Sequence, residues 1–264
     1  MSSSSIFLET SIQIRRFLGE RIEQDLIEEE LRKLAPNVFT SAYVWMEFQR
    51  TLLADYAHIQ RLMLNYNSWG KVMTHLLTGR RGFQPRSGVR CTQILGRLYE
   101  ESEGEWEFAW HLINNALKID LHAQFWTHVT KLPDPVVCDL VVAGVTLNSD
   151  QTYAVPDSCR KQTASCQLPD FLEAHHSELR TLAQYLSSHP RAIKNQSRVS
   201  RLLTVVLNEP RAALGQSACW ALGDIIIALQ VPPDAAIWTV DSDFKALTTA
   251  FGHQLYSPLS NKST

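Results

Sequence analysis

Short apolar runs that end in an acidic residue occur near both ends of the chain. Residues 5–9 read SIFLE, and residues 235–241 read AAIWTVD. A short apolar run bounded by polar residues is typical of a strand buried inside a parallel sheet. The pattern therefore predicts a buried strand at each place, with Glu9 and Asp241 projecting from the carboxyl ends of the strands.

Helical patterns lie between and beyond these runs. One expected helix begins near Thr10 or Ser11. Four more are expected at residues 22–34, 41–65, 214–229 and 243–251. Two shorter segments, VFTSAY and HQLYS, predict a short strand or turn and a final edge strand. Strands that alternate with helices imply a parallel sheet, so the predicted fold class is α/β. Ligand sites in such folds lie beyond the carboxyl ends of the strands.

The middle of the chain is longer and less regular than its ends. It is rich in helical patterns but broken by GRRGFQPRSG, by KLPDPVV and by a polar stretch over residues 148–169. The valine-rich run at residues 136–147 predicts a strand, or a ribbon with QTYAV. We therefore expect a core built from residues 1–66 and 205–264, with a mostly helical insertion at residues 67–204.

Two further acids stand in apolar surroundings. Glu47 belongs to YVWMEF at the start of a predicted helix, and Asp224 belongs to ALGDIIIAL. Any one such acid is more often a helix cap or a surface carboxylate, and Asp243 has the position of a cap for the helix that follows it. Several acids brought together, however, repel one another unless a cation lies between them. A divalent metal ion is the common solution, since carboxylates are its preferred ligands.

The contexts of these acids resemble those of the PIN-domain nucleases. The matching features are a first strand that ends in an acid and Thr-Ser, an S-x-Y-x-x-x-E-F helix start, a G-D-x-x-I-A helix and a closing T-x-D-x-D-F. The resemblance covers roughly residues 5–66 and 214–257. It implies a three-layer α/β/α fold with a central parallel sheet. It also implies acids that bind Mg²⁺ or Mn²⁺ and hydrolyse phosphodiester bonds in RNA, or less often in DNA.

The resemblance assigns roles to individual residues. The implied catalytic acids and metal ligands are Glu9, Glu47, Asp224 and Asp241. The implied supporting residues are Thr10, Ser11, Thr239 and Asp243. Two features depart from the family pattern: the long middle segment, and Glu9, which stands where the family usually has aspartate. The extra methylene of Glu9 moves the carboxylate by ~1.5 Å, and Mg²⁺ demands near-ideal octahedral geometry, so we expect a preference for Mn²⁺.

Basic residues are unevenly distributed, although the formal net charge is only -2. Residues 71–99 contain no acid, and a second basic row covers residues 191–201 with spacings that predict one face of a helix. Such rows are expected to bind a nucleic-acid backbone, and the alternative is a solvated face. The expected nucleic-acid-binding residues are Lys71, Arg80, Arg81, Arg86, Arg90, Arg191, Lys194, Arg198 and Arg201.

The cysteines, together with a histidine, suggest one further candidate metal site. A tetrahedral Zn²⁺ site can be drawn from Cys138, Cys159, Cys166 and His175, and the alternative is a buried cysteine with solvent-facing histidines. The five cysteines are an odd number, and the N-terminus lacks the pattern of a signal peptide, so reduced thiols and a cytoplasmic location are expected. No stretch approaches the ~18 apolar residues of a membrane span, and no membrane partner is expected.

Together these patterns predict a metal-dependent endoribonuclease, with RNA rather than DNA as the first expected partner and a regulatory protein as a further one. The alternative is a weak or inactive PIN-like scaffold that binds RNA or a protein without cleaving it. A phosphatase-like hydrolase of small phosphates would use the same acids without the basic residues. Convergence of the carboxylates of Glu9, Asp224 and Asp241 favours an enzyme, whereas splayed carboxylates favour a scaffold.

Overall fold

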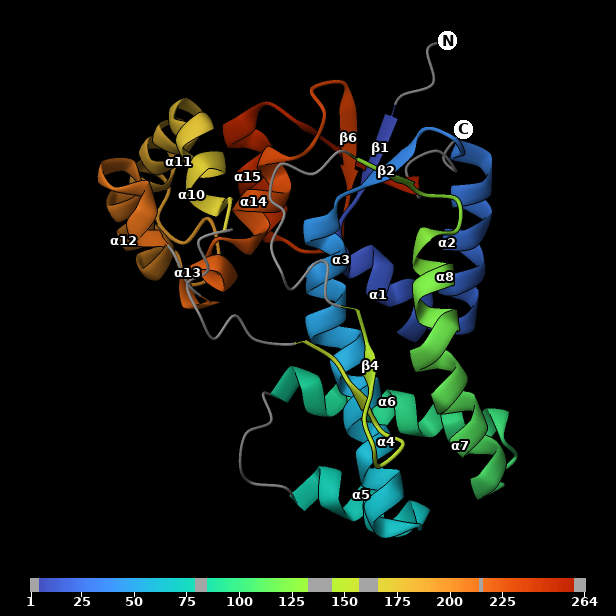
Figure 1. The fold of residues 1–264 in the computed structure, drawn as a ribbon. Helices are drawn as coiled ribbons and strands as arrows, with labels where there is room; N and C mark the ends of the chain where they lie inside the picture. Colours follow the sequence, from blue (N-terminus) through green and yellow to red (C-terminus); the bar gives the residue numbers. More distant parts are fainter. Residues whose placement is uncertain (1–4, 79–84, 133–143, 157–165, 214–215, 259–264) are drawn as a thin grey trace.

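A five-stranded sheet lies at the centre of the structure, a computed structural model that describes residues 5–78, 85–132, 144–156, 166–213 and 216–258. All neighbouring strands are parallel, in the order β3-β2-β1-β6-β7. The strands are β1 (Ser5–Leu8), β2 (Val38–Thr40), β3 (Thr130–Lys131), β6 (Ala235–Trp238) and β7 (Gln254–Tyr256). Because β1 lies between β2 and β6, the two ends of the chain meet in the middle of the sheet (Figure 1).

One face of the sheet is covered by α1 (Thr10–Leu18) and α2 (Arg21–Leu34). Ile6 and Leu8 of β1 project to this face and pack with Ile27 and Leu31 of α2. The alternation of side chains along a strand sends Phe7 to the opposite face. There Phe7 joins the larger core cluster, which includes residues of the helices that follow β2 and β6.

The helices on that second face are α3 (Ala42–Phe48), α14 (Gly223–Leu229) and α15 (Asp243–Phe251). Ser41 caps α3 by accepting a hydrogen bond from the backbone N–H of Val44 at 3.2 Å. Helices therefore cover both faces of a parallel sheet, and the α/β fold class is confirmed.

The described helices within residues 67–221 form two groups (Figure 1). After α3, the π-helical segment η1 (Gln49–Leu53) and α4 (Ala54–Tyr66) lead away from the sheet. The first group contains α5 (Trp69–Thr78), α6 (Pro85–Glu101), α7 (Trp106–Asn115), the π-helical segment η2 (Ala116–Asp120) and α8 (Leu121–Trp126). The second group contains α10 (Leu168–Ala174), α11 (His176–Ser188), α12 (Gln196–Asn208), η3 (Pro210–Ala213) and α13 (Gln216–Ala221). The second group lies beside α14 and α15, and α11 packs on α15.

Most of the predicted elements are present. The predicted strands at SIFLE, VFTSAY, AAIWTV and HQLYS correspond to β1, β2, β6 and β7. A short antiparallel ribbon of β4 (Thr146–Leu147) and β5 (Tyr153–Ala154) pairs the end of the valine-rich run with QTYAV. Residues 136–143 of that run lie outside the described residues.

Three features differ from the predictions. The fifth strand, β3, comes from the middle segment, so the chain ends do not build the whole sheet. The long helix predicted at 41–65 contains the wider π turns of η1, and the helix predicted at 214–229 is divided at Leu222 into α13 and α14. Within the described residues, none of the helices combines the length and the apolar character that crossing a bilayer requires.

Candidate active site

Four acidic side chains come from the ends of four different elements. Glu9 follows directly after β1, and Asp241 lies three residues after the neighbouring strand β6. Glu47 belongs to α3, and Asp224 belongs to the first turn of α14. Both helices cover the Phe7 face of the sheet. The parallel topology therefore directs Glu9 and Asp241 to the carboxyl edge of the sheet, as the sequence predicts. The helices α3 and α14 bring Glu47 and Asp224 close enough for their charges to act on those of the strand-end acids.

Glu9 is 3% exposed and is held by hydroxyl groups. Its Oε2 accepts hydrogen bonds from the Ser11 backbone N–H and from Thr239 Oγ1, both at 2.9 Å, and also from Ser11 Oγ. The first of these bonds caps α1, so the cap interpretation is confirmed for this acid. Burial raises the pKa of Glu9 despite these bonds. No described residue donates a hydrogen bond to its Oε1.

The hydroxyls of Ser11 and Thr239 also join the ends of β1 and β6. Ser11 Oγ accepts a hydrogen bond from the backbone N–H of Val240 at 3.1 Å, and Thr239 Oγ1 accepts one from that of Asp241 at 3.0 Å. These bonds position the segment after β6 relative to Glu9. The supporting positions assigned to Ser11 and Thr239 therefore lie in contact with the acids.

Glu47 lies in a tight space between α1 and α14. Its Oε2 accepts a hydrogen bond from Thr10 Oγ1 at 2.9 Å, and its Oε1 faces Gly223 so closely that a Cβ atom there would lie 2.4 Å away. Burial raises the pKa of Glu47 to about 8, and the charges of Asp224 and Glu9 add to the effect. Residue 223 must therefore be glycine for Glu47 to occupy this position.

Asp224 has neither a hydrogen bond nor an ion pair to any other described residue through its carboxylate. Burial raises its pKa to about 7, with further contributions from the charges of Glu9, Asp241 and Asp243. The negative charges of these acids thus raise one another's pKa values, so the acids lie near a common site. Carboxylates that repel in this way favour a cation between them.

The structure supplies one cation from the middle segment. Lys194 lies in the loop between α11 and α12, and its Nζ is 2.6 Å from Asp241 Oδ1 and 3.7 Å from Asp243 Oδ1. Its backbone N–H donates a hydrogen bond of 3.0 Å to Asp243 Oδ2. The carboxylate of Asp243 therefore binds this loop. The N-cap residue of α15 is Ser242, which directly precedes the helix. The alternative interpretation, in which Asp243 caps the helix that follows it, is therefore wrong.

The second basic row does not form the predicted helical face. The helix α12 begins only at Gln196, and Arg191 and Asn195 both adopt positive φ angles, of 68° and 52°. Arg191 and Lys194 therefore lie in the turns between α11 and α12, whereas Arg198 and Arg201 lie on α12 itself. The spacing of three and four was misleading because loop turns interrupt it.

The described residues of the first basic row belong to α5 and α6, in the helical group beyond α4 (Figure 1). Lys71 is exposed on α5, whereas Arg90 Nε pairs with Asp55 Oδ2 at 2.6 Å. The contact of Arg90 indicates a structural role, so it is a weak candidate for nucleic-acid binding. Arg80, Arg81 and the side chain of Arg86 lie outside the described residues.

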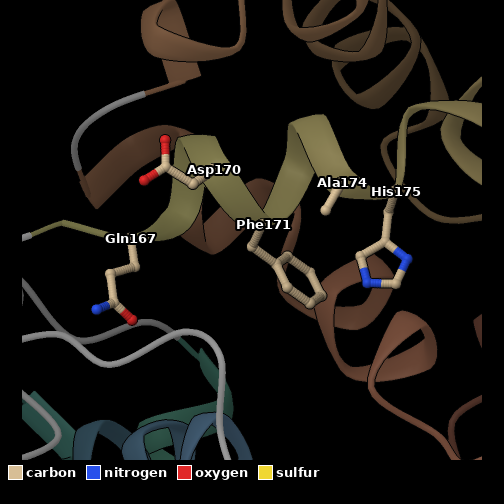
Figure 2. Close-up of a pocket in the computed structure, with 5 residues that line it drawn as sticks. All are labelled: Gln167, Asp170, Phe171, Ala174 and His175. Atoms are coloured by element: carbon tan, nitrogen blue, oxygen red, sulfur yellow. The ribbon is translucent and has the colours of Figure 1, made fainter.

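The zinc hypothesis falls partly outside the described residues, which include neither Cys138 nor Cys159. His175 Nδ1 lies 3.5 Å from Glu178 Oε1, and its ring centroid is 4.5 Å from that of Phe171. His175 and Phe171 project from the same side of α10 into an open pocket of about 310 Å³ (Figure 2). Among the residues that the structure describes, no three or more His, Cys, Asp and Glu side chains are arranged as a metal-binding group.

Two residues beside the acids were given no role from the sequence, although Tyr43 belongs to the S-x-Y-x-x-x-E-F motif. Arg50 follows Glu47 by one helical turn, and its charge lowers the pKa of Glu47. Tyr43, one turn before Glu47, donates a hydrogen bond through its hydroxyl to the Cys219 carbonyl at 2.8 Å. The spacing of three and four residues from Glu47 was the available signal.

Comparison with protein-family models, with curated proteins and with solved structures finds no match to this chain.

Proposed function

We propose that this protein is a metal-dependent nuclease with a PIN-like fold, which hydrolyses phosphodiester bonds in RNA. The observation that carries the proposal is the electrostatic coupling of Glu47 and Asp224 with Glu9 and Asp241 at the carboxyl edge of a parallel sheet. The motif contexts of these acids support a PIN-like assignment. The α/β layering agrees with it.

The donor atoms are of the type that a hard divalent cation prefers, although the described side chains are not arranged as a metal-binding group. Oxygen ligands are those that Mg²⁺ and Mn²⁺ prefer, and Glu9 Oε1 and the Asp224 carboxylate lack hydrogen bonds from the described residues. The residues that would hold the ion are Glu9, Glu47, Asp224 and Asp241. When bound, such an ion neutralises an anionic phosphate and lowers the pKa of water.

The residues of the chain itself position the acids. Thr10 orients the Glu47 carboxylate, while Ser11 and Thr239 orient that of Glu9. Because these hydroxyls come from the start of α1 and the end of β6, the carboxylates are anchored to rigid elements. A site anchored in this way loses little free energy in ordering its ligands when a substrate arrives.

Cleavage of labelled single-stranded RNA and DNA in Mn²⁺, in Mg²⁺ and in EDTA tests the proposal. We expect RNA cleavage with metal, a higher rate with Mn²⁺ than with Mg²⁺, and no cleavage in EDTA. Cleavage that persists in EDTA at the same rate would exclude the metal-dependent mechanism. The Asp224→Asn variant, purified identically, controls for contaminating nucleases.

A second candidate is a scaffold that binds RNA without cleaving it. The observation that favours it is the Lys194 ammonium group beside Asp241 and Asp243, since an internal cation already offsets part of the negative charge. A scaffold is expected to retain RNA in a binding assay, to leave it intact in Mn²⁺, and to show no change in Tm when Mn²⁺ is added.

Gly223→Ala is expected to reduce cleavage about fivefold while leaving the fold intact. The added Cβ would lie 2.4 Å from Glu47 Oε1, so the carboxylate must move, and a flexible side chain can do so at small cost. The measurements are the initial cleavage rate and the Tm. Gly96→Ala on α6 is the matched control, because its Cβ meets nothing within 4 Å. Equal cleavage rates in the two variants would contradict a role for the Glu47 position.

A further inference from the structure

Arg50 and Trp220 lie next to the acids, on elements that are joined to each other. Arg50 is in η1, one turn after Glu47, and Trp220 is in α13, four residues before Asp224. The hydrogen bond from Tyr43 to the Cys219 carbonyl connects α3 with α13, and Gly223 lies against Glu47. This packing brings the two side chains to the Glu47 and Asp224 side of the acid site.

The Arg50 guanidinium is poorly partnered. Its Nε is buried and has no hydrogen-bond partner, and Nη1 makes only a long contact of 3.9 Å with Cys219 Sγ. No acid of the described residues forms an ion pair with the Arg50 guanidinium, although its positive charge is close enough to lower the pKa of Glu47. By contrast, Arg16 forms an ion pair with Glu28, and Arg90 forms one with Asp55. A guanidinium with donors left over beside an acidic site is suited to bind a phosphate.

Trp220 is the most exposed of the seven tryptophans, with 52% of its surface accessible. The Arg50 guanidinium carbon lies 6.0 Å from the ring centroid of Trp220, at the outer limit of a cation–π contact. An exposed indole supported by a cation offers a flat apolar surface. Such surfaces bind the bases of single-stranded nucleic acids by stacking, with little regard to sequence.

From these contacts we infer that Arg50 and Trp220 form a substrate subsite, in which Trp220 stacks on an unpaired nucleobase and Arg50 binds an adjacent phosphate. The inference rests on the proposed nuclease function and specifies its substrate as single-stranded. In a duplex, both faces of each base are stacked on neighbours, so the indole has no free base to contact. The subsite places the backbone of a bound strand beside Glu47 and Asp224.

Binding is measured in EDTA, where the proposed cleavage is absent, by the anisotropy of a fluorescein-labelled single-stranded ten-nucleotide RNA. Trp220→Leu is expected to raise Kd roughly 5- to 150-fold, the range for loss of one stacked base. Arg50→Met is expected to raise Kd about tenfold and to reduce the salt slope by about 0.7, the value for one lost phosphate contact on a single strand. Duplex RNA of the same sequence is expected to compete at least tenfold less well than the single strand.

Two matched controls separate the subsite from general surface effects. Phe108→Leu removes another exposed aromatic ring, on α7, and Arg61→Met removes a charge from α4. Both are expected to leave Kd within about twofold of wild type. A Tm within a few degrees of wild type verifies that each variant is folded, and Arg50→Lys, which retains the charge, is expected to recover part of the affinity.

Unchanged Kd in both Trp220→Leu and Arg50→Met, or duplex binding equal to that of the single strand, would overturn the subsite. Metal-dependent cleavage that requires Asp224 would still stand in that case. Conversely, loss of affinity in these variants, with no cleavage in any metal, would retain the subsite and reject the nuclease. A wild-type protein that fails to bind single-stranded RNA would also overturn the subsite and would leave Trp220 as a protein-docking residue.

Discussion

Asp224→Asn is expected to abolish cleavage and, in metal-free protein, to raise the Tm at pH 8. The reason is that the Asp224 carboxylate is buried among other acids and forms neither a hydrogen bond nor an ion pair with another residue in the part of the chain that the structure describes. Asparagine fills nearly the same space without the charge. The repulsion from Glu9 and Asp241 is therefore removed, whereas the packing of α14 is kept.

The pH dependence follows from the raised pKa of Asp224, which is about 7 in the folded protein against 3.8 for an unperturbed aspartate. Between these values the folded protein holds a proton that the unfolded chain releases, so the free energy of unfolding falls as pH rises. Glu47, with a pKa of about 8 against 4.5, acts in the same direction. The variant loses the Asp224 contribution, so its Tm advantage is expected to be near zero at pH 4 and to grow until about pH 7.

The raised pKa sets an upper limit of about 4 kcal/mol on the advantage above pH 7, and an increase of several degrees in Tm is expected for a chain of this size. Cleavage is expected to fall at least about 100-fold, because the variant lacks one proposed metal ligand. Asp234→Asn is the matched control, since Asp234 is exposed in the turn before β6. Thermal melts from pH 4 to 8 in EDTA provide the test. A variant that melts below wild type at pH 8 and still cleaves would contradict the site.

The central strands and the acids were predictable because each is marked by a local pattern. SIFLE and AAIWTV are apolar on both faces, as a strand between two helical layers must be, and the residues that end them reach the carboxyl edge by topology alone. Thr130–Lys131 was missed because this two-residue edge strand is exposed and carries no periodicity. An edge strand that short is visible only from its pairing with β2.

Loop-borne features of the site were not predictable for a related reason. Lys194 had a helical spacing to Arg191 and Arg198, yet the backbone turns at Arg191 and Asn195, and the ammonium group reaches Asp241 instead. Nothing in the local sequence encodes this contact, since 47 residues separate the partners. Likewise, the exposed Trp220 can be recognised as a neighbour of the acids only from the packing of α13 beside α3. Sequence patterns thus located the acids but not the basic and aromatic groups around them.

Lys194→Met is expected to strengthen Mn²⁺ binding about tenfold, because the ammonium group and a divalent cation compete for the same oxygens of Asp241. In the absence of metal the variant is expected to be slightly less stable than wild type. Lys194 is 44% exposed, so solvent screening limits the lost ion-pair energy to about 1 kcal/mol. The Tm increase on adding Mn²⁺ should therefore be larger in the variant than in wild type.

The measurement is the titration of Mn²⁺, with the free ion followed by electron paramagnetic resonance and the Tm recorded in parallel. Lys245→Met, an exposed lysine on α15, is the matched control and is expected to bind Mn²⁺ as wild type does. Equal Mn²⁺ affinity in Lys194→Met and wild type would mean that the ion does not share Asp241 with the lysine. No Mn²⁺ binding in any of the three proteins would mean that Lys194 is the resident cation of this acidic site, and the non-cleaving scaffold would then be the better description of the protein.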